Sequence, residues 1–535
     1  MKKFMSAFLT GLLILAFGAI AYAQDTKITG TYPGLEWKAS GFIDAQTLFF
    51  RNVTGGNGAA GILPAWGAGQ PTTWALALPS SFAAGEPVGQ LDKKQAYWES
   101  RMRLKFDWIY GKATSGTVQF EADANPWGST PGGFVGKISD RNSYGTTETA
   151  ADRAALEIKA VYFDFATPYF GIPVPMNFRV GLQPLTLRVP LLLLTDGMAI
   201  KGTFKVDPAT IETWYVKYLE GAPGGRPRGA DDADMYGLHA NAAIDKLTVG
   251  GYFLYYNMNT YPFTVPQAIT TVSGLTRLAY GTQTADFWWL GLYADGRVGP
   301  VNINFDFIYD NGKVKSRTPD VQDVKYRGFA TRLAVDYPWE QFNFGIIGAY
   351  GSGADTRKTA ANGLAGSTTF DGDDSTKVGS FVIPPSSESP AAFGESIVLF
   401  SSWINRGDSG IGSTFNYDQV SKGGLGGLWY AKVYGSYKPT PWYKITLSGL
   451  YIGDTTKHGN TFGNAHDAND ELRNDRKIGW ETDLVNEIEI YKNLKFAIGF
   501  GHLWAGSAMD LYNGAGENYS PKNPWQITSN MSYFF

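Results

Sequence analysis

Apolar and charged side chains alternate along residues 97–110, and this alternation indicates the fold. The stretch is Tyr97-Trp-Glu-Ser-Arg-Met-Arg-Leu-Lys-Phe-Asp-Trp-Ile-Tyr110. The apolar set, interrupted only by Ser100, is Trp98, Met102, Leu104, Phe106, Trp108 and Tyr110. The charged set is Glu99, Arg101, Arg103, Lys105 and Asp107. A period of two residues predicts a β-strand. A charged second face and aromatic residues at both ends of the apolar face predict lipid on one side and water on the other.

The same alternation recurs along the chain, at 118–123, 178–183, 301–310, 329–337 and 443–451. Glycine is frequent, at 65 of 535 residues, and aromatic residues make up 15% of the chain. Small inward-facing residues explain much of the glycine content, and membrane-facing strands explain the aromatic content. The sequence therefore predicts an all-β transmembrane barrel rather than several soluble domains.

The number and spacing of the candidate strands support a closed antiparallel barrel. Short and long connections alternate, which is typical of barrels with short periplasmic turns and long external loops. The count is about 18 strands, with 16 as the alternative, and even numbers are usual in bacterial single-chain barrels. The candidates are 35–50, 95–110, 116–125, 156–166, 176–184, 197–206, 209–219, 234–245, 246–258, 284–297, 300–310, 325–337, 341–351, 426–438, 441–453, 477–490, 494–506 and 525–535.

The N-terminal segment resembles a secretory signal peptide. Lys2 and Lys3 precede an apolar run from Ala7 to Ile20, and Ala21-Tyr-Ala23 supplies a small-x-small cleavage pattern. We expect cleavage after Ala23, leaving residues 24–535 as a single barrel domain. The location expected is the outer membrane of a Gram-negative bacterium.

Composition excludes several other functions. The chain has no cysteine, which rules out disulfides, thiol catalysis and iron–sulfur clusters. A net charge of −3 argues against nucleic-acid binding. The four histidines match no standard zinc spacing, and the acidic group at Asp371, Asp373 and Asp374 lacks the remainder of a calcium loop. We expect no catalytic residue, metal or cofactor.

The last candidate strand carries an insertion signal. Trp525, Ile527, Met531, Tyr533 and Phe535 share one face, and Phe535 ends the chain. A terminal aromatic residue on an alternating last strand is the mark that the barrel-assembly machinery recognises. Tyr533 and Phe535 are therefore the expected insertion signal.

Several stretches resemble the homotrimeric outer-membrane porins of sulfate-reducing and related bacteria. They are Glu99–Asp107, Thr117–Asp123, Asn125–Gly128, Arg179–Gln183, Phe287–Gly291, Tyr326–Phe329, Ala349–Asp355 and Tyr491–Leu494. The resemblance implies a passive, trimeric, water-filled channel. The partners expected are two further copies of the chain, outer-membrane lipid with lipopolysaccharide, and the barrel-assembly machinery.

Charged residues at inward positions are the candidate pore lining. If Tyr110 pairs with Gly116, then Lys105 faces Glu121 and Arg103 faces Asp123, which predicts a salt-bridged wall. The other interpretation is a basic stripe that attracts anions, opposed by an acidic strand at 477–490. The complete candidate set is Glu99, Arg101, Arg103, Lys105, Glu121, Asp123, Arg179, Asp306, Arg332, Glu481 and Asp483.

Two connections have unusual composition. Residues 352–425 are too many for a plain external loop, and they include the apolar group Ile397–Phe400. Three arrangements are open: a cap outside the pore, a fold into the lumen, or a latch onto a neighbouring subunit. Because an exposed apolar group is unfavourable, we favour the second or third. The run Leu191–Leu194 is treated in the same way, as an inward-folded loop or a trimer contact.

The function that the sequence favours is passive diffusion of small hydrophilic solutes and ions. The alternative is a substrate-selective channel of the same fold, for sugars or carboxylates, which an ordered row of inward aromatic residues would favour. Tyr97 and Trp288 are inward candidates, but they form no continuous row. A barrel adhesin or barrel enzyme is a further alternative, to be judged by loop contacts or a Ser–His pair.

Overall fold

The computed structural model describes residues 34–51, 94–122, 156–167, 174–189, 191–219, 232–259, 271–272, 275–276, 283–316, 323–355, 377–387, 395–400, 420, 424–512 and 517–535. The expected signal peptide, Asp123, the Asp371 group and much of 352–425 lie outside these residues. No helix in the described part of the chain is long and apolar enough to cross a membrane.

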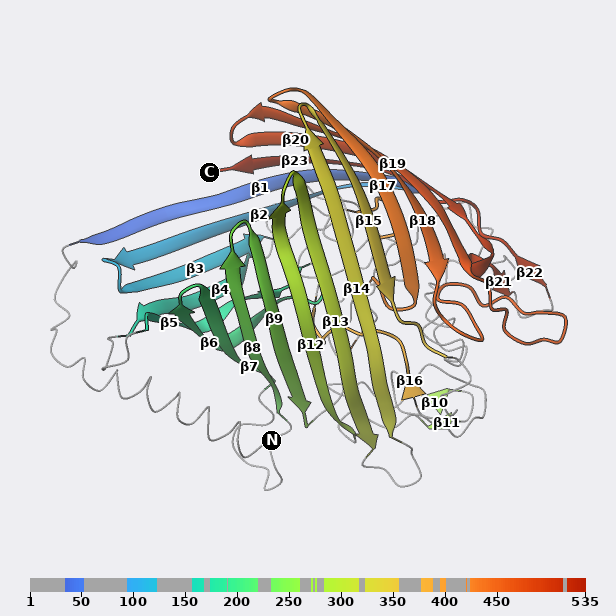
Figure 1. The fold of residues 1–535 in the computed structure, drawn as a ribbon, viewed down its shortest axis with the longest axis horizontal. Coiled ribbons are helices and arrows are strands. Elements are labelled where there is room, and N and C mark those ends of the chain that lie inside the picture. The colour runs from blue at the N-terminus through green and yellow to red at the C-terminus, as the bar shows by residue number, and fades with distance from the viewer. Residues whose placement is uncertain are drawn as a thin grey trace, which may run out of the picture.

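Eighteen long strands form one closed antiparallel barrel (Figure 1). They are β1 (Leu35–Arg51), β2 (Lys94–Tyr110), β3 (Thr114–Ala122), β4 (Leu156–Ala166), β5 (Met176–Leu187), β6 (Leu193–Val206), β7 (Ala209–Leu219), β8 (Ala233–Ile244), β9 (Leu247–Met258), β12 (Gln283–Val298), β13 (Val301–Ser316), β14 (Val324–Trp339), β15 (Phe342–Gly351), β17 (Leu428–Thr440), β18 (Tyr443–Asp454), β19 (Lys477–Tyr491), β20 (Leu494–Ala505) and β23 (Trp525–Phe534).

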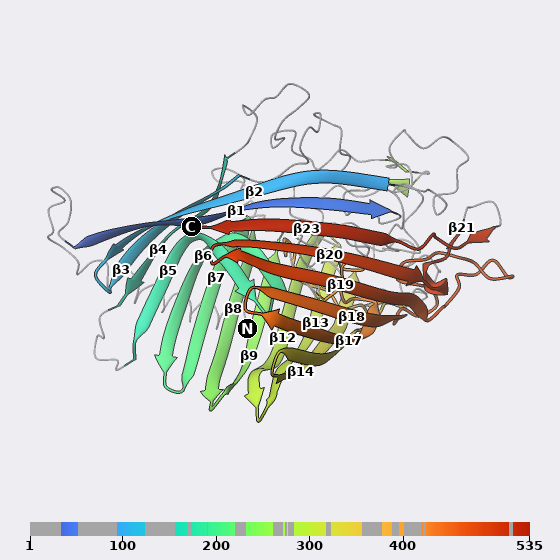
Figure 2. The same cartoon turned by 90° about the horizontal axis from the view of Figure 1, so that it is seen from above.

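The barrel closes between its first and last strands. Each long strand pairs with its neighbour in sequence order, and β23 pairs with β1 from Phe42↔Phe534 to Arg51↔Trp525. Phe535 extends the closure, since its backbone N–H donates to the carbonyl of Gly41 at 3.1 Å and its carbonyl accepts from the N–H of Gly41 at 2.9 Å. Figure 2 shows β1 and β23 running side by side. The predicted antiparallel barrel of 18 strands is therefore confirmed.

Several short elements lie in the connections between the long strands. The two-residue strand β16 (Lys377–Val378) continues the sheet by pairing in parallel with β14. Two small hairpins, β10 (Thr271–Val272) with β11 (Leu275–Thr276) and β21 (Leu511–Tyr512) with β22 (Asn518–Tyr519), are separate from the barrel. A single turn of 3₁₀ helix, η5 (Ser507–Met509), follows β20.

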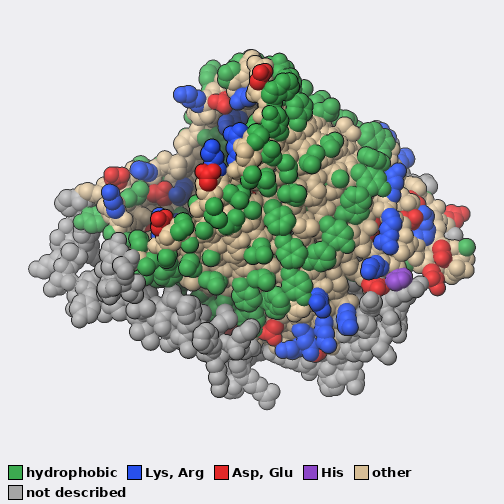
Figure 3. Space-filling view, in the orientation of Figure 1, with side chains coloured by type: hydrophobic (Ala, Val, Ile, Leu, Met, Phe, Trp, Pro, Cys, Tyr) green, Lys and Arg blue, Asp and Glu red, His purple; other side chains and the backbone are tan. Residues whose placement is uncertain are grey.

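Alternation places apolar side chains outside, whereas the inner face carries charged and small side chains together with apolar ones that are buried in the interior cluster. On β14, Phe329, Leu333 and Tyr337 are exposed on the outer face, whereas Tyr326 and Ala330 are buried on the inner face. The outer surface in Figure 3 carries hydrophobic side chains over most of its height. An apolar exterior of this kind is stable in lipid and unfavourable in water.

Two details of the sequence prediction were wrong. The β2–β3 register pairs Trp108, not Tyr110, with Gly116, so Arg103 faces Glu121 and Lys105 faces Gln119. The tight turn at 111–113 lets β3 begin at Thr114, which shifts the pairing by two residues and leaves every side chain on its predicted face. The prediction that Trp288 faces inward was also wrong. Trp288 shares the outward face of the exposed Leu290 and Leu292, while Trp289 is buried inside.

Candidate functional site

The inner face of β2–β8 is an ion-paired wall. Glu121 is 1% exposed, and Arg103 contacts it directly. Arg101 and Lys159 each lie 3.6 Å from its carboxylate, and Lys159 also bonds Asp196 at 2.8 Å. One buried acid thus lies beside three cations, and with Asp196 these five groups retain one excess positive charge.

The same wall continues through β5–β8. Arg179 donates through Nε and Nη2 to the two carboxylate oxygens of Asp164, at 2.8 and 3.0 Å, and lies 4.1 Å from the centre of the Tyr162 ring. Farther round, Glu212 accepts from Lys201 at 2.8 Å and contacts His239 at 3.1 Å. Each of these pairs joins neighbouring strands, which stiffens the wall.

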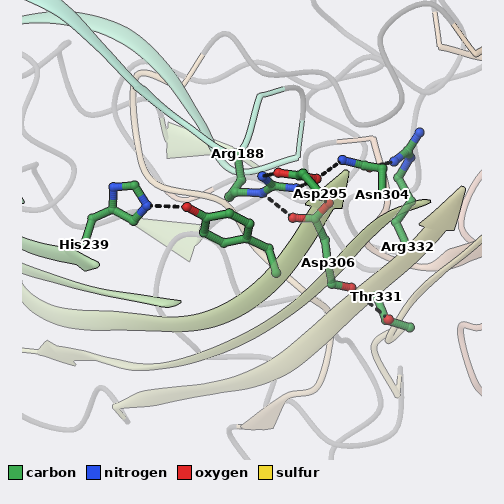
Figure 4. A network of polar contacts seen from close by, with 8 residues as sticks. Arg188, His239, Asp295, Asn304, Asp306, Thr331 and Arg332 are labelled. Atoms are coloured by element: carbon green, nitrogen blue, oxygen red, sulfur yellow. Dashed lines mark hydrogen bonds and ion pairs between the residues drawn. The ribbon is translucent and has the colours of Figure 1, made fainter. Parts of the chain in front are cut away.

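The turn between β5 and β6 folds into the lumen instead of away from the barrel. Leu185, Leu187 and Leu191–Leu193 are all buried in the interior cluster. At the turn, Arg188 contacts Asp295 on β12 and Asp306 on β13, and its guanidinium lies 4.1 Å from the Tyr293 ring centre. Because β7, β8 and β9 separate β6 from β12 in the sheet, Arg188 ties the turn across the interior (Figure 4).

Two described parts of the long connection after β15, residues 377–387 and 395–400, also lie inside; we call them the lumenal segments. Trp289 donates to the carbonyl of Val382 at 2.7 Å, and the buried Asp310 accepts from the N–H of Val382 at 3.4 Å. A Cβ at Gly328 would lie 2.6 Å from the Phe381 backbone, so glycine is required for this approach. Ser387 bonds Leu192 at 2.8 Å, joining the segment to the inward turn.

The second lumenal segment is held by two buried carboxylates. Glu481 on β19 accepts from the N–H groups of Ile397, Val398 and Leu399 at 2.9, 2.8 and 3.1 Å, and from the Ser396 hydroxyl at 2.7 Å. The Glu395 carboxylate accepts a hydrogen bond from Nε of Arg332 at 2.7 Å. Buried charged groups are retained only when such partners satisfy them. Segment and wall are therefore fixed together.

A cavity of about 260 Å³ remains between the second lumenal segment and the wall of β15 and β17–β19. Its lining combines charged groups with hydroxyl groups: Lys432, Lys444, Asp483, Tyr434, Thr446 and Ser448. Lys432 is 8% exposed and donates to the backbone carbonyl of Glu395 at 2.7 Å. The cavity offers both signs of charge to a small polar molecule.

The predicted site residues fall into three groups. Arg101, Arg103, Lys105, Glu121 and Arg179 lie on the ion-paired wall, where Lys105 bonds Asp107 at 3.0 Å. Asp306, Arg332, Glu481 and Asp483 lie on the opposite inner face, beside the inward turn, the lumenal segments or the cavity. The Glu99 side chain and Asp123 are outside the described part. The basic residues do not form one stripe, since Arg332 is on β14.

Sequence reasoning missed the residues that join the lumen to the wall. Arg188, Lys432 and Glu395 are isolated charges in apolar or irregular surroundings. The lone Arg188 beside a leucine run was the usable signal, because a charge next to so apolar a group needs a partner. Aromatic residues do lie on the inner face, but they are buried in the interior and not exposed along an open path. They are Tyr256, Phe287, Trp289, Tyr326 and Tyr430.

No protein-family model matches the chain, and no curated protein matches it in sequence. Solved structures resemble it in fold. OccK8 (OprE) of Pseudomonas aeruginosa has a TM-score of 0.45 at 10% identity, covering 93% of this chain and 98% of that chain. OpdK of the same organism, crystallised with vanillate, gives 0.44 at 10% identity over 93% and 98%. OmpT of Vibrio cholerae gives 0.36 at 9% identity over 95% and 99%.

Proposed function

We propose that this protein is an outer-membrane channel through which small hydrophilic solutes and ions diffuse passively. The observation that carries the proposal is the sidedness of the closed barrel wall, which is apolar outside and carries its ion-paired charged side chains inside. A barrel of 16 to 18 strands is wide enough to enclose an aqueous channel. The lumenal segments narrow that channel from one side.

The outer surface supports a membrane-spanning position. A row of aromatic rings crosses β7–β15 at the end with the long connections, with Trp288, Tyr309, Phe329 and Tyr350 among them; ring centres lie 5.4 Å apart for Trp288–Tyr309 and 5.5 Å for Phe329–Tyr350. A second row includes Trp339 at the other end of β14. Ten residues of strand tilted by about 40° rise about 25 Å, the height of an outer-membrane apolar belt.

The interior supports a water-filled path. On the ion-paired wall the side chains of Lys105 and Arg179 are 36% and 35% exposed, although both form ion pairs. On the opposite face Arg188 and Arg332 are 14% and 12% exposed. Charged groups that remain in contact with solvent on an inner face are expected where water runs beside them.

The orientation and the assembly are part of the proposal. We place the long connections outside the cell and the short turns in the periplasm, with an exported precursor cleaved after Ala23. The aromatic pair Tyr533 and Phe535, both exposed on the outer face, fits a role in recognition by the assembly machinery. We further propose a homotrimer related to the porins of sulfate-reducing bacteria, and no catalytic role.

A substrate-selective channel is the second candidate, and the cavity favours it. A site lined by Lys432, Asp483 and several hydroxyl groups suits a sugar or a small carboxylate better than it suits a bare ion. Such a solute would bind weakly during passage instead of diffusing freely.

Planar-bilayer recording of the purified protein tests both candidates. Stepwise currents support a channel, and steps grouped in threes support the trimer. Solute-dependent blocking of the current, reduced by Lys432→Gln and unchanged by Lys438→Gln at the short-turn end, would favour the selective channel. A correctly folded protein that inserts and passes no current would rule out both.

A further inference from the structure

The outer surface carries a row of cations beyond the aromatic row, at the end with the long connections. We define this cationic row as Lys313 and Lys315 on β13, Lys325 and Arg327 on β14, and Lys377 on β16. Their sequence neighbours Val314, Val324, Tyr326 and Val378 are buried in the interior, so alternation directs the cations outward. Figure 3 shows a group of Lys and Arg side chains at the lower edge of this face, below the hydrophobic surface.

Strand register brings like charges together in this row. Lys313 lies directly opposite Lys325, and Lys325 lies directly opposite Lys377. Like charges at such positions destabilise a sheet. Asp323 pairs with Lys313 at 2.5 Å and Asp286 pairs with Lys315 at 3.0 Å.

Lys325 and Arg327, by contrast, have no ion-pair partner among the residues that the structure describes. Among the described residues, Lys325 and Arg327 thus add positive charge beside the cations paired with Asp286 and Asp323, on a chain whose net charge is −3. An anion bound here would relieve the repulsion between the facing lysines.

The height of the row matches the headgroup level of a membrane. Lys325 is four residues beyond the aromatic Phe329, and Lys313 is four residues beyond Tyr309. At about 3.3 Å per residue and a tilt of about 40°, four residues place the cations roughly 10 Å past the aromatic rings. Aromatic side chains mark the edge of the hydrocarbon, so the cations lie where lipid phosphates would be.

The opposite ends of the same strands have no equivalent row. Their outer residues include Val298, Tyr337 and Trp339, followed by the acidic Glu340. The arginine there, Arg297, donates to the backbone carbonyl of Gly299 at 3.0 Å. The asymmetry argues against cations placed only to anchor both ends of the barrel at the two interfaces.

We propose that the cationic row binds the phosphate group of a phosphorylated glycolipid in the outer leaflet. Lysine and arginine donate charge-assisted hydrogen bonds to phosphate oxygens. A lipid is favoured over free phosphate because the same molecule can lay its acyl chains on the adjacent aromatic and apolar surface. The inference rests on the outer-membrane position proposed above.

Binding to defined lipids tests the inference. The full chain, in nanodiscs of phosphatidylcholine, is titrated with bisphosphorylated lipid A, with dephosphorylated lipid A and with inorganic phosphate. The variant Lys313→Gln/Lys325→Gln/Arg327→Gln should weaken binding of the bisphosphorylated lipid by roughly fivefold per cation, or on the order of a hundredfold in total. Lys112→Gln/Lys438→Gln/Lys492→Gln, with all three substitutions at the short-turn end, is the matched control and should bind as the parent does.

Conductance of the same samples separates this inference from the proposed function. The triple variant should conduct as the parent does, since its substitutions face away from the lumen. Equal binding of the dephosphorylated lipid, undiminished binding by the triple variant, or equally effective inorganic phosphate would overturn the lipid site while leaving the channel intact. A parent protein that neither inserts nor conducts would instead reject the proposed function.

Discussion

Two regions of the inner face contain the same types of charged residue, but the ion pairs that these residues form differ in what they join and in how exposed they are. On the ion-paired wall of β2–β8, Arg179 and Asp164 pair between neighbouring strands, and the arginine stays 35% exposed. Around β12–β19, Arg188, Glu395 and Glu481 join the wall to elements inside the lumen, and Glu481 is 1% exposed.

The contribution of each ion pair therefore depends on its solvent exposure. An exposed pair is worth little, because water competes with it. A buried charge that loses its partner is strongly destabilising. We therefore infer that the exposed pairs of the ion-paired wall tune the field in the channel, while the buried pairs around β12–β19 determine its width.

The largest effect is expected at Arg188. Arg188→Ala leaves Asp295 and Asp306 without their shared cation, and should lower the free energy of unfolding by about 3–5 kcal/mol. Denaturant unfolding in detergent measures it. Combining Arg188→Ala with Asp306→Asn should restore part of the loss, and Arg297→Ala at a turn should have little effect. A change below that of Arg297→Ala would contradict the anchoring role.

The next effect is expected at Glu481. Glu481→Gln replaces a carboxylate that accepts four hydrogen bonds from the second lumenal segment, and should cost about 2 kcal/mol. Because the segment is then loosely held, single-channel conductance should rise and become noisier. Glu489→Gln, on the same strand but exposed, is the control. Unchanged conductance with a folded barrel would show that this segment does not limit the channel.

A smaller change in stability is expected at Arg179. Arg179→Ala should cost about 1 kcal/mol, because the side chain is one-third exposed. It also removes a cation from the solvent-exposed wall, so the reversal potential in a salt gradient should shift toward cation selectivity. Arg179→Lys keeps the charge and should keep the selectivity. A shift of equal size in both variants would mean that the charge itself does not act on permeating ions.

The smallest effect is expected at Lys444, which pairs with Glu487 at 2.7 Å and is 40% exposed. Lys444→Gln should change the free energy of unfolding by less than about 0.5 kcal/mol. Because Lys444 also lines the cavity, blocking by a small carboxylate should weaken while stability does not change. A loss of stability like that of Glu481→Gln would remove the distinction between the two regions.

The barrel could be predicted from the sequence because the alternation within each strand distinguishes its outer face from its inner face. The alternation at Tyr97–Tyr110 sorts side chains into lipid and lumen without reference to any other strand. The eighteen candidate strands correspond one to one with the long strands observed. The register of β2 with β3 was wrong by two residues, since alternation is unchanged by a shift of two.

The interior could not be predicted in the same way. Facing inward does not say what a residue meets there: Asp306 meets Arg188, and Glu481 meets the Ile397–Leu399 backbone. These contacts cross the lumen between segments far apart in sequence. The Trp288-Trp289 pair offered an aromatic side chain to each face, so only the neighbouring Leu290 and Leu292 identify which one is inside.

Thiol labelling tests whether a water-filled path runs along the ion-paired wall, since the chain has no cysteine of its own. Single variants place a cysteine on the ion-paired wall (Lys105→Cys), beneath the lumenal segments (Ala330→Cys) and on the outer face (Leu333→Cys). With the protein in a bilayer, a membrane-impermeant charged thiol reagent should react at position 105 and alter the conductance. It should react at neither of the other two. Protection of position 105, or equal reaction at all three positions, would contradict a water-filled path along that wall.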